Sequence, residues 1–249
     1  MSNFKILHPY ITNFSSTTST TFNSGLTAGY GSRKDRLETT TPATSSFLQI
    51  NLTAATAVDF VYIANLDLSC RLIDPTDLTV TIQGSTSSGF GTSEDFTYSV
   101  GLSDLIGRYQ RDWVHAVAFT TSYQYYRVKV SSGSSKSWVT GKIWLGSAID
   151  LGNPNIKLKT SDSKKTNGHR EQIRELDFTF NGLTLTQQNN FFATVEKYNA
   201  FSDLVLWDVD DSIFDNSETV IYGKLLEARK QFKAGGQNYE MNLKFKEVY

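Results

Sequence analysis

Apolar residues along this chain recur mostly at every second position, which is the spacing of β-strands with one buried face. The clearest case is Tyr239–Phe245, where Tyr, Met, Leu and Phe alternate with polar or charged residues. Leu78–Gln83 and Tyr126–Val130 alternate in the same way, whereas Val58–Leu66 is a mostly apolar run, as expected of a buried strand. β-branched and aromatic residues dominate these segments. The pattern therefore predicts a mainly β protein.

Residues 46–152 contain several such segments, separated by turns rich in Gly, Ser and Asp. Ser/Gly composition marks Gly84–Gly89 as a loop. Trp144 lies in the strand-like segment Gly141–Gly146, so we expect it to pack in a core. Many short strands with turn signals between them favour a β-sandwich over a parallel α/β sheet.

Residues 173–249 mix two periods. Around Phe191–Tyr198 the large apolar residues follow helical spacing, and Thr186 is the predicted N-cap of that helix. Asn181-Gly182 is a strong turn signal. Strands are predicted at Leu176–Phe180, Leu204–Trp207, Val220–Tyr222 and Tyr239–Lys246. The order β-α-β-β-β predicts a small α+β domain with one helix on a mainly antiparallel sheet.

Two further regions lack strong periodicity. Residues 1–45 are rich in Ser and Thr, which is compatible with a flexible tail or with an extended arm that becomes ordered against a partner. Large apolar residues such as Phe4, Ile6 and Phe14 favour the arm. Residues 153–172 include the polar stretch Ser161–Gly168 and are predicted to be a linker between the two domains.

Composition narrows the classes of function. The chain has 24 basic and 25 acidic residues, a formal net charge of −1, so it lacks the long-range attraction that nucleic acid or an anionic membrane requires. We find no secretory signal at the N-terminus and no apolar stretch long enough for a membrane span. Cys70 is the one cysteine, which excludes an internal disulfide and fits assembly in a reducing cytoplasm.

Candidate chemistry is sparse. Asp208–Asp215 resembles a site for a hard cation, but Ile213 stands where a calcium-binding loop needs Gly, so a solvated loop is favoured and no metal or cofactor is predicted. His8, His115 and His169 are isolated in the sequence and form no zinc motif. We predict no catalytic residues and no enzymatic activity.

One loop combines cations with aromatic side chains, a mixture found in protein contacts and in sugar-binding sites. Two interpretations are open for this loop: a contact surface for a protein or a sugar, and ordinary loop packing. Loop packing is the favoured one, and the contact surface is kept as a candidate. Its members are Arg108, Tyr109, Arg111 and Trp113.

The segments together resemble two known families. The first block is similar to the discoidin-type, galactose-binding-like sandwich, and the resemblance is carried by Val58–Ser69, Leu78–Ser85, Tyr125–Val130 and Gly141–Gly146. The second block is similar to distal-tail and tail-hub proteins of tailed bacteriophages. That resemblance is carried by Leu176–Leu185, Phe191–Tyr198, Leu204–Asp208 and Tyr239–Glu247.

The resemblance implies a virion structural protein of a phage tail tip, assembled in the host cytoplasm. Its copies would form a ring, expected to be a hexamer, that connects the tail tube to the hub and the receptor-binding fibres. The partners implied are its own copies, other tail proteins and host glycans. The alternative is a carbohydrate-binding protein that recognises host-surface glycans; a glycan-degrading enzyme is the weakest of the three hypotheses.

Overall fold

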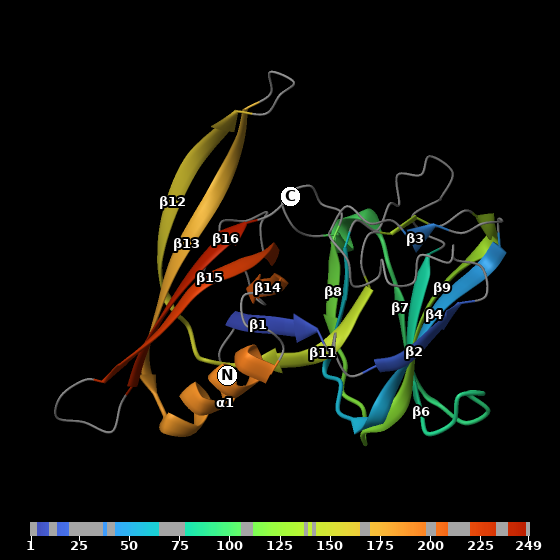
Figure 1. The fold of residues 1–249 in the computed structure, drawn as a ribbon. Helices are drawn as coiled ribbons and strands as arrows, with labels where there is room; N and C mark the ends of the chain where they lie inside the picture. Colours follow the sequence, from blue (N-terminus) through green and yellow to red (C-terminus); the bar gives the residue numbers. More distant parts are fainter. Residues whose placement is uncertain are drawn as a thin grey trace. The chain divides into compact units, whose positions relative to one another are not determined.

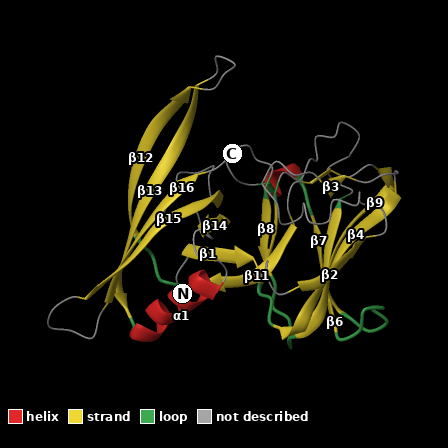
Figure 2. Cartoon of the chain, viewed as in Figure 1, coloured by secondary structure: helices red, strands yellow, loops and turns green. Residues whose placement is uncertain are grey.

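The chain is mainly β, with one α-helix among the residues that the structure describes (Figures 1 and 2). The computed structural model describes residues 4–9, 14–19, 37–38, 43–64, 78–105, 112–136, 139–140, 143–164, 170–197, 203–208, 220–232 and 239–247. They form two compact units. One unit is Pro9–Ser147, and the other combines Met1–His8 with Ala148–Tyr249. Each unit is described separately below.

The first unit contains a five-stranded antiparallel sheet with the order β2-β4-β9-β6-β7. Its strands are β2 (Phe14–Ser19), β4 (Ala43–Thr56), β6 (Thr79–Ser85), β7 (Glu94–Ser99) and β9 (Tyr123–Lys136). Side chains of β6 alternate between partly exposed and buried positions from Thr79 to Gly84, as the sequence predicts. A short pair, β3 (Leu37–Glu38) with β10 (Val139–Thr140), and a 3-10 turn η2 (Leu102–Asp104) complete the described elements beside the second sheet.

The second sheet of this unit has the order β11-β5-β8, again antiparallel. Its strands are β5 (Phe60–Ile63), β8 (Trp113–Ala116) and β11 (Ile143–Ile149). Ile50 from β4, Val61 from β5 and Leu145 from β11 belong to one buried cluster, so the core lies between the two sheets. All four residues of β5 are fully buried, which agrees with the apolar run in the sequence. The β-sandwich prediction is confirmed.

The second unit is built on one antiparallel sheet, in which the strand order runs β12-β13-β16-β15-β14-β1. Its strands are β1 (Phe4–Pro9), β12 (Asn155–Lys164), β13 (Arg170–Leu183), β14 (Asp203–Asp208), β15 (Val220–Phe232) and β16 (Tyr239–Glu247). On β16, the side chains of Met241, Leu243 and Phe245 are buried, and the residues between them are partly exposed. One face of the sheet is thus apolar and the other polar, so the α+β prediction is confirmed.

Helix α1 (Leu185–Lys197) is the helix drawn in Figure 2 beside this sheet. It packs on the apolar face of the sheet through Phe191, which is fully buried. Its N-terminus is a capping box: the Gln187 backbone N–H donates to Thr184 Oγ1 at 3.1 Å, and the Thr184 N–H donates to Gln187 Oε1 at 3.0 Å. The N-cap is therefore Thr184 rather than the predicted Thr186. At 13 residues, and as the one helix described, α1 does not meet the length and apolarity of a membrane span.

An ion pair extends the apolar face at the end of β16. Arg174 Nη2 donates to Glu247 Oε1 at 2.6 Å and Arg174 Nε donates to Oε2 at 2.7 Å. The side chains are 12% and 3% exposed, respectively, so the bidentate pair lies in a largely dry environment. Nothing in the sequence pattern singled out these two residues, because their partnership depends on strand pairing across 73 positions.

The structure differs from three expectations about organisation. Residues 153–172, expected to be a linker, include β12, which pairs with β13 from Asn155↔Thr179 to Lys164↔Arg170. Residues 1–45, expected to be one arm, contribute β1 to the second unit and β2 to the sandwich. Asn181-Gly182 lies at a bulge in β13 rather than in a hairpin turn, and Gly182 has φ +74° there. In each case strand pairing with a distant segment decides the conformation.

Candidate interaction surfaces

The structure describes one of the four predicted contact residues. Arg108, Tyr109 and Arg111 lie outside the described residues, so their role stays a prediction. Trp113 is 3% exposed and belongs to the core of the sandwich. Its neighbour Asp112 is also buried and accepts a hydrogen bond from Tyr62 Oη at 2.8 Å. The described end of this loop therefore contributes packing, which was the alternative interpretation.

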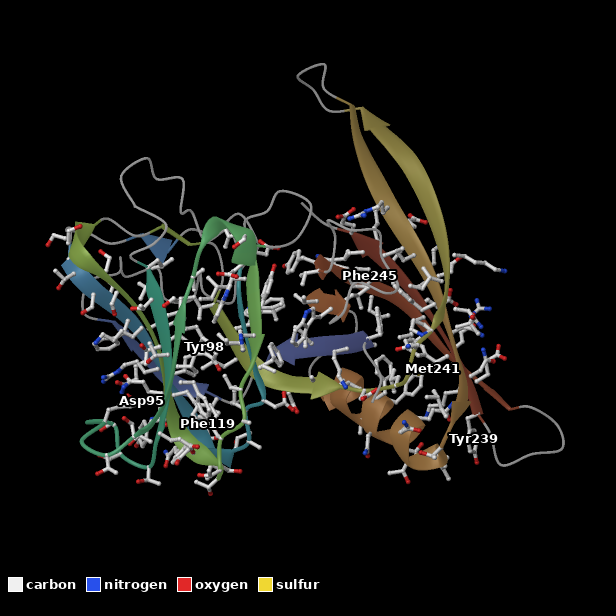
Figure 3. All side chains as sticks on the ribbon, turned by 180° about the vertical axis from the view of Figure 1, so that it is seen from behind. Asp95, Tyr98, Phe119, Tyr239, Met241 and Phe245 are labelled. Carbon is white, nitrogen blue, oxygen red and sulfur yellow. The ribbon has the colours of Figure 1, made fainter. Side chains whose placement is uncertain are left out.

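Trp113 packs in a small aromatic group between β7 and β8. The rings of Tyr98 and His115 lie 4.0 Å apart between centroids, and Trp113 lies 5.6 Å from His115 and 5.7 Å from Tyr98. Burial raises the pKa of the Tyr98 phenol. Figure 3 shows Tyr98 and Phe119 on the inner side of the sandwich sheet, where both pack against the core. This group closes the sandwich between β7 and β8.

The outer face of the five-stranded sheet carries a polar row that crosses four strands. In the strand register, Gln49 of β4 is opposite Arg127 of β9, which is opposite Gln83 of β6, which is opposite Asp95 of β7. Arg127 Nη2 donates to Gln49 Oε1 at 2.9 Å, and Gln83 Nε2 donates to Asp95 Oδ2 at 2.9 Å. Asp95 is exposed on the solvent side (Figure 3). We call these four residues the Arg127 row.

Two phenyl rings lie against the guanidinium of this row. Arg127 Cζ is 4.1 Å from the centroid of Phe47 and 4.0 Å from that of Phe90, distances at which cation–π attraction operates. Phe90 lies in the β6–β7 loop with φ +52°, an uncommon conformation for an aromatic residue. Gln49 Nε2 also donates to the carbonyl oxygen of Ser88 in that loop at 3.2 Å. The loop is therefore held against the outer face of the sheet.

The Arg127 row has unused hydrogen-bonding capacity. Among the described residues, the buried atoms Arg127 Nε and Gln83 Oε1 have no hydrogen-bond partner. Burial lowers the pKa of the Arg127 guanidinium, and the nearby Asp95 charge opposes this effect. One donor, one acceptor and one exposed carboxylate thus lie beside partly exposed phenyl rings. Sugar-binding sites combine such polar groups with aromatic faces.

A second polar cluster closes the end of the sandwich. The Glu94 carboxylate accepts hydrogen bonds from the Thr120 backbone N–H and hydroxyl, at 3.0 Å each for Oε2, and from Tyr123 Oη at 3.0 Å. Desolvation acts to raise the pKa of Glu94, but these hydrogen bonds outweigh it and the pKa is lowered. Burial and the hydrogen bond to Glu94 raise the pKa of Tyr123. Because the Glu94 carboxylate oxygens already accept hydrogen bonds from Thr120 and Tyr123 of the same chain, we assign this cluster a structural role.

The second unit presents a charged face, opposite the face that α1 covers. The side chains alternate in sign across the sheet: Lys157 is opposite Asp177, which is opposite Lys244, which is opposite Glu227. In the next row Lys246 is opposite Glu175 on one side and Lys224 on the other, so the alternation does not extend across that row. The Glu175 carboxylate lies 3.5 Å from Lys244 Nζ of the first row and 3.9 Å from Lys246 Nζ. A hollow of about 360 Å³ lies over part of this face. We call this surface the charged face.

The charged face ends at β12. In the described pairings β12 is bonded to β13 along one side and to no strand along its other side. Every second residue of this ten-residue strand therefore presents its backbone N–H and C=O groups at the edge of the sheet. No metal-binding group of three or more His, Cys, Asp or Glu residues occurs in the described parts of either unit. The predicted acidic loop beyond Asp208 lies outside them.

The comparisons with known proteins give no family. No family model matches the chain and no curated protein matches it. Similar solved structures include chitosan-binding module 1 of a chitosanase/glucanase from Paenibacillus sp. IK-5, at 17% identity over 57% of this chain and 100% of that one, with a TM-score of 0.41.

Two others are described as carbohydrate-binding modules as well. The CBM32 of AlyQ, in complex with 4,5-unsaturated mannuronic acid, matches at 14% identity over 56% of this chain and 98% of that one, with a TM-score of 0.37. A fucose-binding module of Streptococcus pneumoniae, SpX-3, matches at 12% identity over 57% and 98%, with a TM-score of 0.40. The β-sandwich is established by the strand pairing and the buried core described above.

Proposed function

We propose that this chain is a structural protein of a phage tail tip, whose second unit assembles with copies of itself into a ring. The observation that carries the proposal is the edge strand β12, which leaves ten consecutive residues bonded along one side alone in the described pairings. A long edge of this kind favours association with another chain. A contact between two different surfaces of identical copies closes into a ring when the rotation between copies allows it.

The two faces of the second unit's sheet support the same proposal. The apolar face is covered by α1 and by side chains of the unit itself, whereas the charged face is polar and carries side chains of both signs. The unit therefore has no further apolar face that needs a lipid or a cofactor to cover it among the described residues. What it offers to partners is an edge and a polar surface. The resemblance of Leu176–Leu185 and Tyr239–Glu247 to distal-tail and hub proteins adds the location in a phage tail.

The test is the oligomeric state of the full chain. Native mass spectrometry and negative-stain microscopy should show closed rings, six copies being the number implied by the resemblance. A chain that stays monomeric at the highest concentration attainable, and also in the presence of the other proteins of the same tail tip, contradicts the proposal.

Carbohydrate binding by the sandwich is the second candidate function. Here the favouring observation is the Arg127 row with its two partly exposed phenyl rings, because sugar hydroxyl groups can donate to the exposed Asp95 carboxylate while apolar C–H faces pack on the rings. A sugar, which presents several hydroxyl groups beside apolar C–H faces, has the matching chemistry. The two proposals are compatible, since a ring can display the sandwich for contact with host glycans.

A glycan array tests this second candidate. The full chain should bind a defined set of glycans, and Arg127→Met should abolish the binding because it removes the donors while keeping an unbranched side chain. Lys129→Met, two residues further along β9, is the matched control that should bind normally. Equal binding by both variants, or no binding by the full chain, contradicts a sugar site at the Arg127 row.

A further inference from the structure

The outer edge of the second unit has a definite charge pattern. Two rows of the charged face reach this edge. The row described above starts with Lys157, which is opposite Asp177, and the next row starts with Lys159, which is opposite Glu175. Both positions at the edge are thus lysine, and both positions on the neighbouring strand are acidic. Opposite charges at directly opposed positions stabilise a strand pair, and like charges destabilise it.

This pattern disfavours pairing of β12 with β12 of a second copy. If two copies paired antiparallel about Leu158, Lys157 of each would be opposite Lys159 of the other. Centring the pair on Lys157 or on Lys159 would place a lysine opposite its own counterpart. These three registers of a two-fold contact therefore oppose like charges. Lysines on an edge strand act in this way against self-association.

The same pattern favours a strand that carries carboxylates. A strand added beside β12 would continue the alternation of sign if its residues opposite Lys157 and Lys159 were Asp or Glu. On the other face of the sheet, β12 presents Ile156, which is half-buried at the rim of the core. An apolar residue next to Ile156 would cover its exposed part. The complementary strand thus alternates acidic and apolar residues.

We propose that the outer edge of β12 binds an acidic, alternating strand of a partner protein by strand addition to the sheet. Main-chain hydrogen bonds supply affinity in this mode of recognition, and the alternate side chains supply specificity. The inference rests on the proposed function in one respect, namely that the β12 edge takes part in an assembly. Beyond the proposed function, it specifies the chemistry of the partner strand and states that the contact joins two different surfaces.

Fluorescence anisotropy with the full chain tests the proposal. The probe is a labelled synthetic peptide that alternates Glu and Val, with peptides of the same length alternating Lys and Val, or Thr and Val, for comparison. We expect the Glu-Val peptide to bind at least about tenfold more tightly than the Lys-Val peptide. The preference should weaken with added salt because exposed charges are screened.

Charge reversal at the edge sharpens the test. Lys157→Glu combined with Lys159→Glu should invert the preference, so that the Lys-Val peptide binds more tightly. Lys224→Glu, an exposed residue of the same charged face on β15, is the matched control and should keep the preference of the original chain. Equal binding of the acidic and basic peptides to the original chain, or an unchanged preference in the double variant, overturns the proposal.

The outcome can be separated from failure of the ring. If the original chain binds the acidic peptide but native mass spectrometry shows monomers under all conditions, the edge inference stands and the ring proposal fails. If rings form, remain intact in the double charge-reversal variant, and the original chain binds the acidic and basic peptides equally, the ring proposal is supported and the edge inference is contradicted.

Discussion

The two units solve the same problem of burying apolar side chains in different ways. The sandwich places its core between two sheets of its own, so that residues such as Ile82 and Leu145 cover each other. The second unit has one sheet, and a single helix packs on its apolar face through Phe191. The sandwich supplies the outer face of its five-stranded sheet as a surface. The second unit keeps a long edge available at β12, which suits assembly.

The largest loss of stability should come from removing core side chains, and the loss of hydrogen-exchange protection should be confined to the unit that carries the substitution. Phe178→Ala removes a fully buried ring that packs 5.5 Å from Phe4, and we expect a loss of about 3–5 kcal/mol in the free energy of unfolding. Hydrogen exchange measured by mass spectrometry should show lost protection in residues 148–249.

The matched variant in the sandwich is Ile82→Ala, with an expected loss of about 2–5 kcal/mol. Its loss of protection should fall in residues 9–147 instead. If either variant lowers protection equally in both units, the units do not carry independent cores and the contrast drawn here is wrong.

Breaking the buried ion pair of the second unit should have a similar or slightly smaller effect. Arg174→Met leaves the Glu247 carboxylate, with its side chain 3% exposed, without its bidentate partner, and we expect a cost of about 3–5 kcal/mol. Chemical denaturation measures it. The double variant Arg174→Met with Glu247→Leu should recover part of the loss because no charge then remains buried. A double variant less stable than the single one contradicts this account.

A smaller effect is expected at the start of α1. Thr184→Ala removes the side-chain acceptor of the capping box and should cost about 1 kcal/mol in the stability of the second unit. Thr186→Ala, at the N-cap position that the sequence had suggested, should cost less. Urea denaturation of both variants decides between the two positions, and an equal loss would contradict the observed cap.

The smallest effect should appear in the pH dependence of the sandwich. The hydrogen bonds from Thr120 and Tyr123 lower the pKa of Glu94 in the folded chain. The stability that they contribute is therefore fully present above the pKa of this group in the unfolded chain, and is lost as the pH falls through the lower pKa of the folded chain. Thermal unfolding should show Glu94→Gln to be less stable near neutral pH, with the difference vanishing in acid. Asp95→Asn controls for the loss of a charge on the same strand, and an acid-independent difference would contradict the assignment.

The sequence predicted most of the fold because alternation reports directly on which face of a strand is buried. Met241, Leu243 and Phe245 are buried as their spacing indicates, and so is Trp144. Strand β12 was missed since its second half, Thr160–Lys164, is polar and has no apolar alternation; it is a strand because β13 pairs with it. The predicted N-cap of the helix, Thr186, is two residues too late in the chain. Thr184 and Thr186 are both acceptable caps by residue type, and Thr184 is the cap because Gln187 exchanges hydrogen bonds with it.

The interaction surfaces were largely hidden from the sequence. Gln49, Gln83, Asp95 and Arg127 come from four strands and meet through register alone. The loop that mixed Arg, Tyr and Trp was easier to notice, but its described end is buried, as the 3% exposure of Trp113 shows. A cation next to aromatic residues in the sequence is therefore a weak guide to an interaction surface here. The fold instead brings Arg127 close to the rings of Phe47 and Phe90, which are distant from it in the sequence.

Strand β1 ties the beginning of the chain to its far end. Ile6 pairs with Leu206 on β14, and the whole sandwich is encoded between these two strands. Strand β14 is translated after all the strands of the sandwich, so the pair of β1 with β14 forms only after those strands have left the ribosome. Completion of the second unit is thus delayed until late in translation, so its edge strand β12 and its charged face form after the strands of the sandwich have been made.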